Sequence, residues 1–217
     1  TLSILLLPPI RNYFAIKAIQ NWVHPELGKI MFANELRFNL WDSSITIKEL
    51  TIKNPPPYPS DYLLRFENLR IKPTFFNNKE ISPALKLDSE KLCLNIYKIP
   101  NYGINIIYLI GSMKTTNETK RADFLLPFSE LSFSKGEITF SQSIEPISIP
   151  IQSSEPRDPN VERYAYNEEY IIKLNTHKYS DIMEKIVETA IINNEKIPRE
   201  IRNKFGEEFY KIYRGVS

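Results

Sequence analysis

Alternating hydrophobic and polar positions dominate the first two thirds of the chain and predict a β-sheet. Within Ile45–Phe76, two strand-like runs flank a proline-rich turn, and each run changes its alternation phase near its middle, at Lys48–Glu49 and at Glu67–Asn68. A third run changes phase within Asp88–Lys91. Because strand side chains alternate with a period of two, a one-residue slip indicates either a flip of face or a bulge. Adjacent slips predict neighbouring strands that bend together into a strongly twisted sheet.

The same periodicities predict the order of elements. Apolar spacings of three and four indicate helices, and alternation bounded by turn residues indicates strands. We expect a meander of strands near residues 29–40, 44–54, 62–74, 84–99, 124–134, 136–143 and 146–152, followed by a short strand at 170–175. We expect helices at 10–23, 103–113, 180–193 and 198–213.

Turn and capping residues refine this order. Lys135–Gly136 predicts a tight hairpin, and Gln152–Glu169 is polar and predicts a connection. Ser180–Asp181 is a plausible N-cap, and Pro198 suits the first turn of the last helix. The predicted fold class is α+β, with a curved, strongly twisted antiparallel sheet resembling half a barrel, an N-terminal helix and a C-terminal helical pair.

The N-terminal residues carry an apolar run that ends at two prolines. Leu2–Leu7 is too short to span a bilayer, so we interpret it as the end of a membrane helix, with packing on the core as the alternative. Pro8–Pro9 would end that helix near the membrane surface, and aromatic residues that follow suit the headgroup level. The expected membrane-proximal residues are Leu5, Leu6, Leu7, Tyr13 and Trp22.

We therefore expect three regions: the end of an anchor at 1–9, a helix and sheet domain at 10–152, and a linker with a helical appendage at 153–217.

Composition gives little support for catalysis or nucleic-acid binding. The 217 residues carry a formal net charge of +2 and no polybasic block, so nucleic acid is not an expected partner. Cys93 is the only cysteine, which excludes an internal disulfide. His24 and His177 have no cysteine or carboxylate at metal-ligand spacing, and the six glycines form no phosphate-binding loop. We expect no catalytic residues, no metal and no cofactor.

Five segments carry a resemblance to a known family. They are Leu50-Thr51-Ile52-Lys53-Asn54-Pro55, Leu64–Ile71, Leu92–Tyr97, Gly103–Leu109 and Leu131–Ile138. In this order, after an apolar run and a short helix, they resemble the N-terminal region of AsmA-like proteins over most of residues 1–152. The resemblance implies an inner-membrane anchor, a periplasmic sheet and no catalytic residues; large members look like long β-grooves that pass phospholipid between membranes. A sheet of about seven strands is only about 30 Å wide, so this chain alone cannot bridge an envelope.

The leading expectation is a membrane-anchored envelope protein that binds or guides phospholipid or another acyl lipid along an apolar sheet face. The residues expected on that face are Leu50, Ile52, Leu64, Phe66, Leu69, Ile71, Leu92 and Leu94. The alternative is a non-catalytic scaffold subunit that uses the sheet and helices to contact other envelope proteins or copies of itself. The positions of helices 180–193 and 198–213 distinguish the two functions. Lipid binding requires that these helices leave an apolar trough open on the sheet, whereas helices that fill the trough favour the scaffold.

Overall fold

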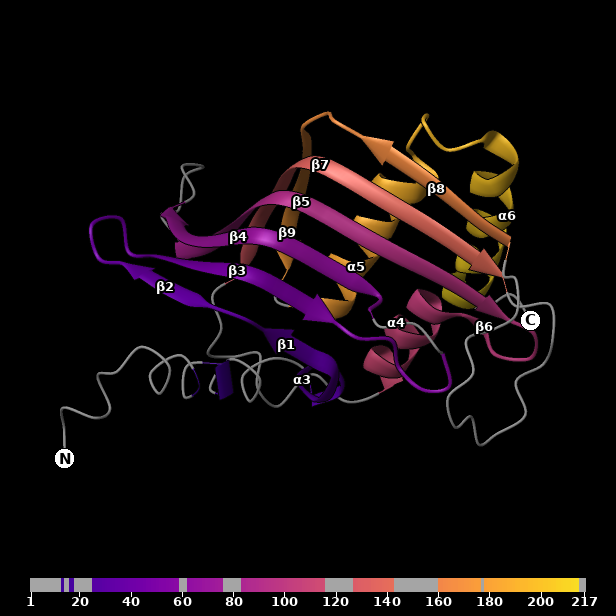
Figure 1. The fold of residues 1–217 in the computed structure, drawn as a ribbon, viewed down its shortest axis with the longest axis horizontal. Coiled ribbons are helices and arrows are strands. Elements are labelled where there is room, and N and C mark those ends of the chain that lie inside the picture. Colours follow the sequence, from indigo (N-terminus) through magenta and orange to yellow (C-terminus); the bar gives the residue numbers. More distant parts are fainter. Residues whose placement is uncertain are drawn as a thin grey trace.

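The computed structural model describes residues 13, 16–17, 25–58, 62–75, 83–115, 127–142, 160–176 and 178–214. Within this part of the chain, a nine-stranded twisted sheet is backed by helices, which confirms the α+β class (Figure 1). The strands are β1 (Met31–Ala33), β2 (Leu36–Asn39), β3 (Ser44–Ile52), β4 (Leu64–Phe75), β5 (Pro83–Ile99), β6 (Gly103–Ile104), β7 (Phe128–Gln142), β8 (Asn160–Tyr166) and β9 (Tyr170–Thr176). The helices are α3 (Pro25–Ile30), α4 (Asn105–Thr115), α5 (Tyr179–Val187), which continues as the π-helix η3 (Glu188–Ile192), and α6 (Arg199–Arg214).

The sheet is mixed, whereas a purely antiparallel meander was predicted. Its main order is β1-β3-β4-β5-β7-β8, with β2 on β3, β6 on β5 and β9 on β7. Every pair is antiparallel except β5 with β7. Helix α4 lies between β5 and β7 in the chain, and a crossover of this kind returns the next strand in the same direction as the first.

Strand β7 is continuous through Lys135–Gly136, so the predicted hairpin there is wrong. Gly136 pairs with Tyr166 of β8, and a Cβ atom at Gly136 would overlap the Tyr166 ring. Gly136 therefore does not form a turn. It lies within a strand, where the absence of a side chain allows an aromatic ring to approach closely.

A crease crosses the sheet at the predicted phase slips. Ile47 pairs with Leu69 on one side of the slip, and Leu50 pairs with Phe66 on the other, without any change of register. All four of these side chains are buried, so the extra residue in each strand preserves the inward face instead of flipping it. Asn68, at the crease, has a left-handed φ of 51°. The structure therefore excludes a flip of face, and because both strands carry their extra residue at the same level, the β3–β4 pair also shows no shift of register.

Both sheet edges break at the same level. On one edge, β1 and β2 pair with the two halves of β3; on the other, β8 and β9 pair with the two halves of β7. The whole sheet thus bends along one line, and the long strands curve near their middles in Figure 1.

Four further predictions concern the C-terminal half. The strand predicted at 170–175 is β9, and the helices predicted at 180–193 and 198–213 are α5 with η3 and α6. The predicted connection 152–169 is wrong in part, because β8 lies inside it and completes an edge of the sheet.

The predicted N-cap is also wrong. Helix α5 starts at Tyr179 after Lys178, without a side-chain cap, so Ser180 lies within the helix. Asp181 instead accepts a hydrogen bond from Thr176 Oγ1 at 2.8 Å, which ties the helix to the end of β9. The strand predicted at 146–152 lies outside the described residues.

Candidate functional site

The eight residues predicted on the apolar face do share one face of the sheet, here called the inner face. All except Ile71 are buried, and Ile71 is partly buried against the same hydrophobic core. Leu64 of β4 pairs with Leu94 of β5, and both side chains are almost completely buried. The structure therefore assembles these residues, but inside the protein.

Helices of the same chain cover the inner face. Their buried apolar side chains belong to the same continuous core as the sheet residues: Ile106, Ile107, Leu109, Ile110 and Met113 of α4, Ile182, Met183, Ile186 and Val187 of α5, Ala190 and Ile191 of η3, and Phe205 and Phe209 of α6. Figure 1 shows α4, α5 and α6 together behind the sheet. Ile16, from the N-terminal helical residues, also packs against this core.

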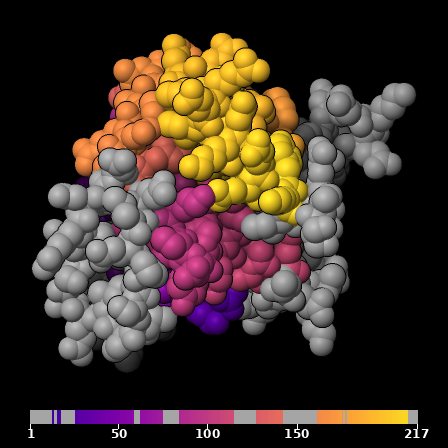
Figure 2. Space-filling view, turned by 90° about the vertical axis from the view of Figure 1, so that its right-hand side faces the viewer, coloured from indigo at the N-terminus to yellow at the C-terminus, as the bar shows by residue number. Residues whose placement is uncertain are grey.

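A small pocket lies where α6 meets the ends of β5, β7 and β8. Its volume is about 200 Å³, and it is lined by Ile96, Lys98, Ile104, Phe140, Ser141, Glu162, Ile201, Lys204, Phe205 and Glu208. Lys98 forms an ion pair with Glu208 beside it, which fastens α6 to β5. Figure 2 views this end of the molecule, with α6 in yellow against the magenta segment. Ligand pockets usually occupy about 300–1,000 Å³, so this space is small for an acyl lipid.

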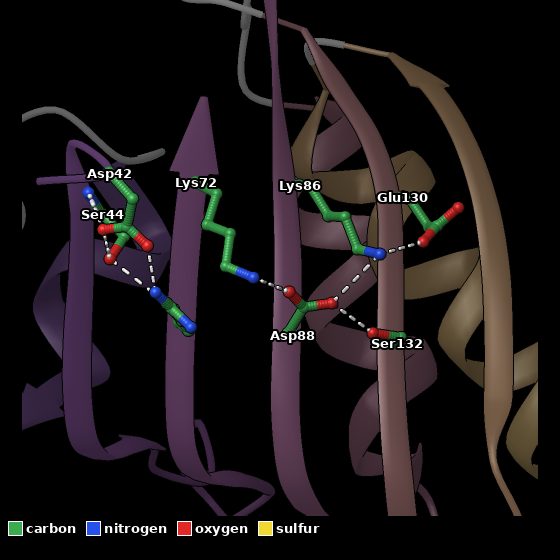
Figure 3. Close-up of polar contacts among 8 residues, drawn as sticks. Asp42, Ser44, Lys72, Lys86, Asp88, Glu130 and Ser132 are labelled. Atoms are coloured by element: carbon green, nitrogen blue, oxygen red, sulfur yellow. Dashed lines mark hydrogen bonds and ion pairs between the residues drawn. The ribbon is translucent and has the colours of Figure 1, made fainter. Parts of the chain in front are cut away.

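The opposite, outer face carries a ladder of charged side chains across four strands, and Figure 3 shows its members on β4, β5 and β7. Asp88 of β5 accepts a hydrogen bond from Ser132 Oγ at 2.5 Å and lies 3.2 Å from Lys72 Nζ. Lys86 Nζ lies 3.4 Å from Asp88 and 2.8 Å from Glu130 of β7, which also pairs with Lys173 of β9. The ladder joins neighbouring strands by ion pairs on a face that water can reach.

Both carboxylates of this ladder are stabilised in their charged form. Burial alone would raise the pKa of Asp88, but hydrogen bonds from Ser132 and Lys72 and the charge of Lys86 lower it overall. Hydrogen bonds from Lys173 and Lys86 lower the pKa of Glu130. An acid for proton transfer at neutral pH needs a raised pKa, so these residues suit a structural role.

Two asparagines from the segments that carry the family resemblance meet in the interior. Asn105 Nδ2 donates to Asn54 Oδ1 at 2.6 Å and to the carbonyl of Asn95 at 2.8 Å. Asn105 Oδ1 accepts from the amide of Tyr97 at 3.1 Å. The start of α4 is thereby fixed to β5 and to Asn54, which follows the end of β3. Sequence spacing alone did not indicate this contact.

The β2–β3 turn presents two apolar side chains that sequence reasoning missed. Leu40 and Trp41 are 90% and 99% exposed, more than the other large hydrophobic residues of the described chain. A partial signal was available, because Trp41 stands in the connection between the strands predicted at 29–40 and 44–54, where polar residues are usual, although Leu40 was assigned to the end of the first strand.

Of the membrane-proximal residues, the structure describes Tyr13 alone, in a helical conformation and exposed. Leu5, Leu6, Leu7 and Trp22 lie outside the described residues. Within the described ranges, no helix has the length and apolarity needed to cross a bilayer. The same ranges contain no group of three or more side chains arranged to hold a metal ion.

Comparison of the chain with known protein families, curated proteins and solved structures found no match. The AsmA-like resemblance therefore stays a prediction from its motifs.

Proposed function

We propose that this protein is a non-catalytic scaffold subunit of a membrane-associated complex in the cell envelope. The supporting observation is the filled inner face: residues expected to contact lipid are buried against α4, α5, η3 and α6 of the same chain. Burying these side chains stabilises the fold and leaves the outer face and the edge strands for partners. The membrane association and periplasmic location in this proposal come from the N-terminal sequence and the family resemblance.

The lipid-guiding alternative requires a different surface. A sliding acyl chain needs a lane that stays apolar along its length and open at its ends. Among the described residues, the pocket beside α6 combines apolar walls with Lys98, Glu162, Lys204 and Glu208, and its 200 Å³ does not extend into such a lane. The scaffold function needs no lane and no rearrangement of the helices.

Adjacent residues on β4 provide a matched test. Ile71 faces the core, whereas Lys72 lies on the outer face beside Asp88. A photo-crosslinking amino acid would replace each residue in turn in the full-length protein, expressed in its native host. The scaffold function predicts that position 72 captures another protein or a second copy, and that position 71 yields only crosslinks within the chain.

Mass spectrometry of the crosslinked products distinguishes the alternatives. A lipid adduct at position 71, together with stoichiometric lipid in the purified protein, would replace the scaffold proposal with lipid binding. Circular dichroism of both variants establishes that each retains the fold before the products are compared.

A further inference from the structure

We propose that the β2–β3 turn is a membrane-contact tip, in which Leu40 and Trp41 enter the headgroup region of a bilayer. The four residues between the paired positions Asn39 and Ser44 form the tip. In Figure 1 this hairpin projects from the end of the sheet opposite α6. The inference rests on the membrane association in the proposed function, but not on the scaffold's partner.

The turn is held in place, so its apolar side chains are presented in a defined way. Asp42 accepts hydrogen bonds from the amide and hydroxyl of Ser44, at 3.2 and 2.6 Å. Arg70 of β4 pairs with Asp42 and donates from Nε to Ser44 Oγ at 3.2 Å. The amide of Trp41 donates to Asn39 Oδ1 at 3.1 Å. A third strand thus braces a turn whose two large side chains make almost no contact with the rest of the protein.

The size of the tip favours a lipid surface over a protein surface. A stable protein interface buries about 800 Å² on each partner, in a matched shape. Two side chains on a convex turn offer much less, whereas a bilayer interface accepts a small tip without matched shape. Tryptophan concentrates at that interface because its ring is apolar and its indole N–H can still reach water.

The charges near the tip indicate insertion rather than electrostatic attraction. At the tip, Asp42 is paired with Arg70, and at the other end of the hairpin Glu35 accepts a hydrogen bond from Arg37 at 2.8 Å and lies 3.9 Å from Lys48. Cations and carboxylates therefore nearly balance here. Binding should occur on zwitterionic phosphatidylcholine vesicles and should change little with salt, because screening acts mainly on unbalanced charge.

A polarity-sensitive fluorophore at position 40 tests this contact directly. The full chain would carry Cys93→Ser and Leu40→Cys, labelled on the new thiol, and would be mixed with phosphatidylcholine vesicles containing a lipid-borne quencher. The matched control carries the label at Ile171→Cys, an apolar residue that is 51% exposed on β9. We expect an apolar emission shift and quenching at position 40, and aqueous emission at position 171.

A second, label-free measurement uses vesicle flotation. Trp41→Ala should lower the partition coefficient by at least about tenfold, the effect of removing one large apolar group from a bilayer, while Ile171→Ala should leave it unchanged. An equal decrease of the partition coefficient in both variants would indicate non-specific adsorption to the vesicles and would overturn the proposal.

Aqueous emission at position 40 on vesicles that carry the protein would also overturn it, and would leave membrane association through another segment intact. A photo-crosslinker at position 41 that captures a protein and no lipid in cells would assign the tip to a protein partner instead. If the unlabelled full chain neither floats with vesicles nor fractionates with membranes, the membrane part of the proposed function fails as well.

Discussion

At the scale of single residues, the space beside Gly136 is already occupied by the ring of Tyr166. That ring belongs to an aromatic group, with Tyr170 at a centroid distance of 4.8 Å and Phe133 at 6.3 Å. A ring enclosed in this way cannot move aside without disturbing its neighbours, so the absence of a side chain at position 136 is a packing requirement.

Gly136→Ala should destabilise the protein by about 1–3 kcal/mol, because the new methyl group overpacks a filled core. The free energy of unfolding in urea measures this loss. Gly111→Ala is the matched control, since a Cβ atom there meets nothing within 4 Å and alanine favours the helix α4. Replacing the ring with a smaller side chain, Tyr166→Leu, should make Gly136→Ala less destabilising in the double variant than it is alone. Strictly additive losses of stability would contradict the steric explanation.

The lowered pKa values of Asp88 and Glu130 predict acid sensitivity. A carboxyl group whose pKa is lower in the folded than in the unfolded protein stabilises the fold above its unfolded pKa. This contribution is lost as pH falls below about 4 and the groups take up protons. Thermal melts between pH 7 and pH 3 should show a smaller decline for Asp88→Asn with Glu130→Gln than for the wild type. An identical decline would show that the ladder does not contribute.

At the scale of elements, Asn105 joins pieces that are distant in the chain. Its amide group bonds to Asn54, to the Asn95 carbonyl and to the Tyr97 amide, all in the interior. Because buried polar groups are costly when unpaired, this residue determines how α4 meets the sheet.

Asn105→Ala should therefore be destabilising by about 1–3 kcal/mol for each buried partner that is left unsatisfied. Chemical denaturation is the measurement, and hydrogen exchange should show the largest loss of protection at the start of α4. Asn203→Ala, at an exposed position of α6, serves as the control and should change stability little. A loss no greater than that of the control would remove Asn105 from this structural role.

At the scale of the whole molecule, two substitutions on the inner face can test whether this face is a filled core or an open lipid trough. Leu92→Asp places a carboxylate in a fully buried site, whereas Ile71→Asp places it at a partly buried position of the same face. An unpaired buried charge costs several kcal/mol, comparable to the total stability of a domain.

We expect Leu92→Asp to prevent cooperative folding and Ile71→Asp to leave a folded but weakened protein, as measured by circular dichroism melts. In an open lipid trough, both variants would stay folded and would lose bound lipid. A folded Leu92→Asp protein would therefore count against the filled face.

The sequence by itself determined where most strands and helices lie and which residues face inward. Ile47, Leu50, Phe66 and Leu69 follow from local alternation, because each strand must present its apolar positions to the core whatever its partner. The phase slips were likewise visible locally, since an extra residue must either flip the face or form a bulge.

Only the tertiary structure decided between these outcomes, because it depends on contacts between distant segments. The direction of β7 relative to β5, the role of Gly136 beside Tyr166 and the Asn54–Asn105 bond all join residues far apart in the chain. Whether α5 and α6 fill the inner face also depends on such distant contacts. An apolar stripe shows that one side of a helix is buried, but it does not show which surface buries it. The exposure of Leu40 and Trp41 is the converse case, since only the folded chain shows that nothing described covers them.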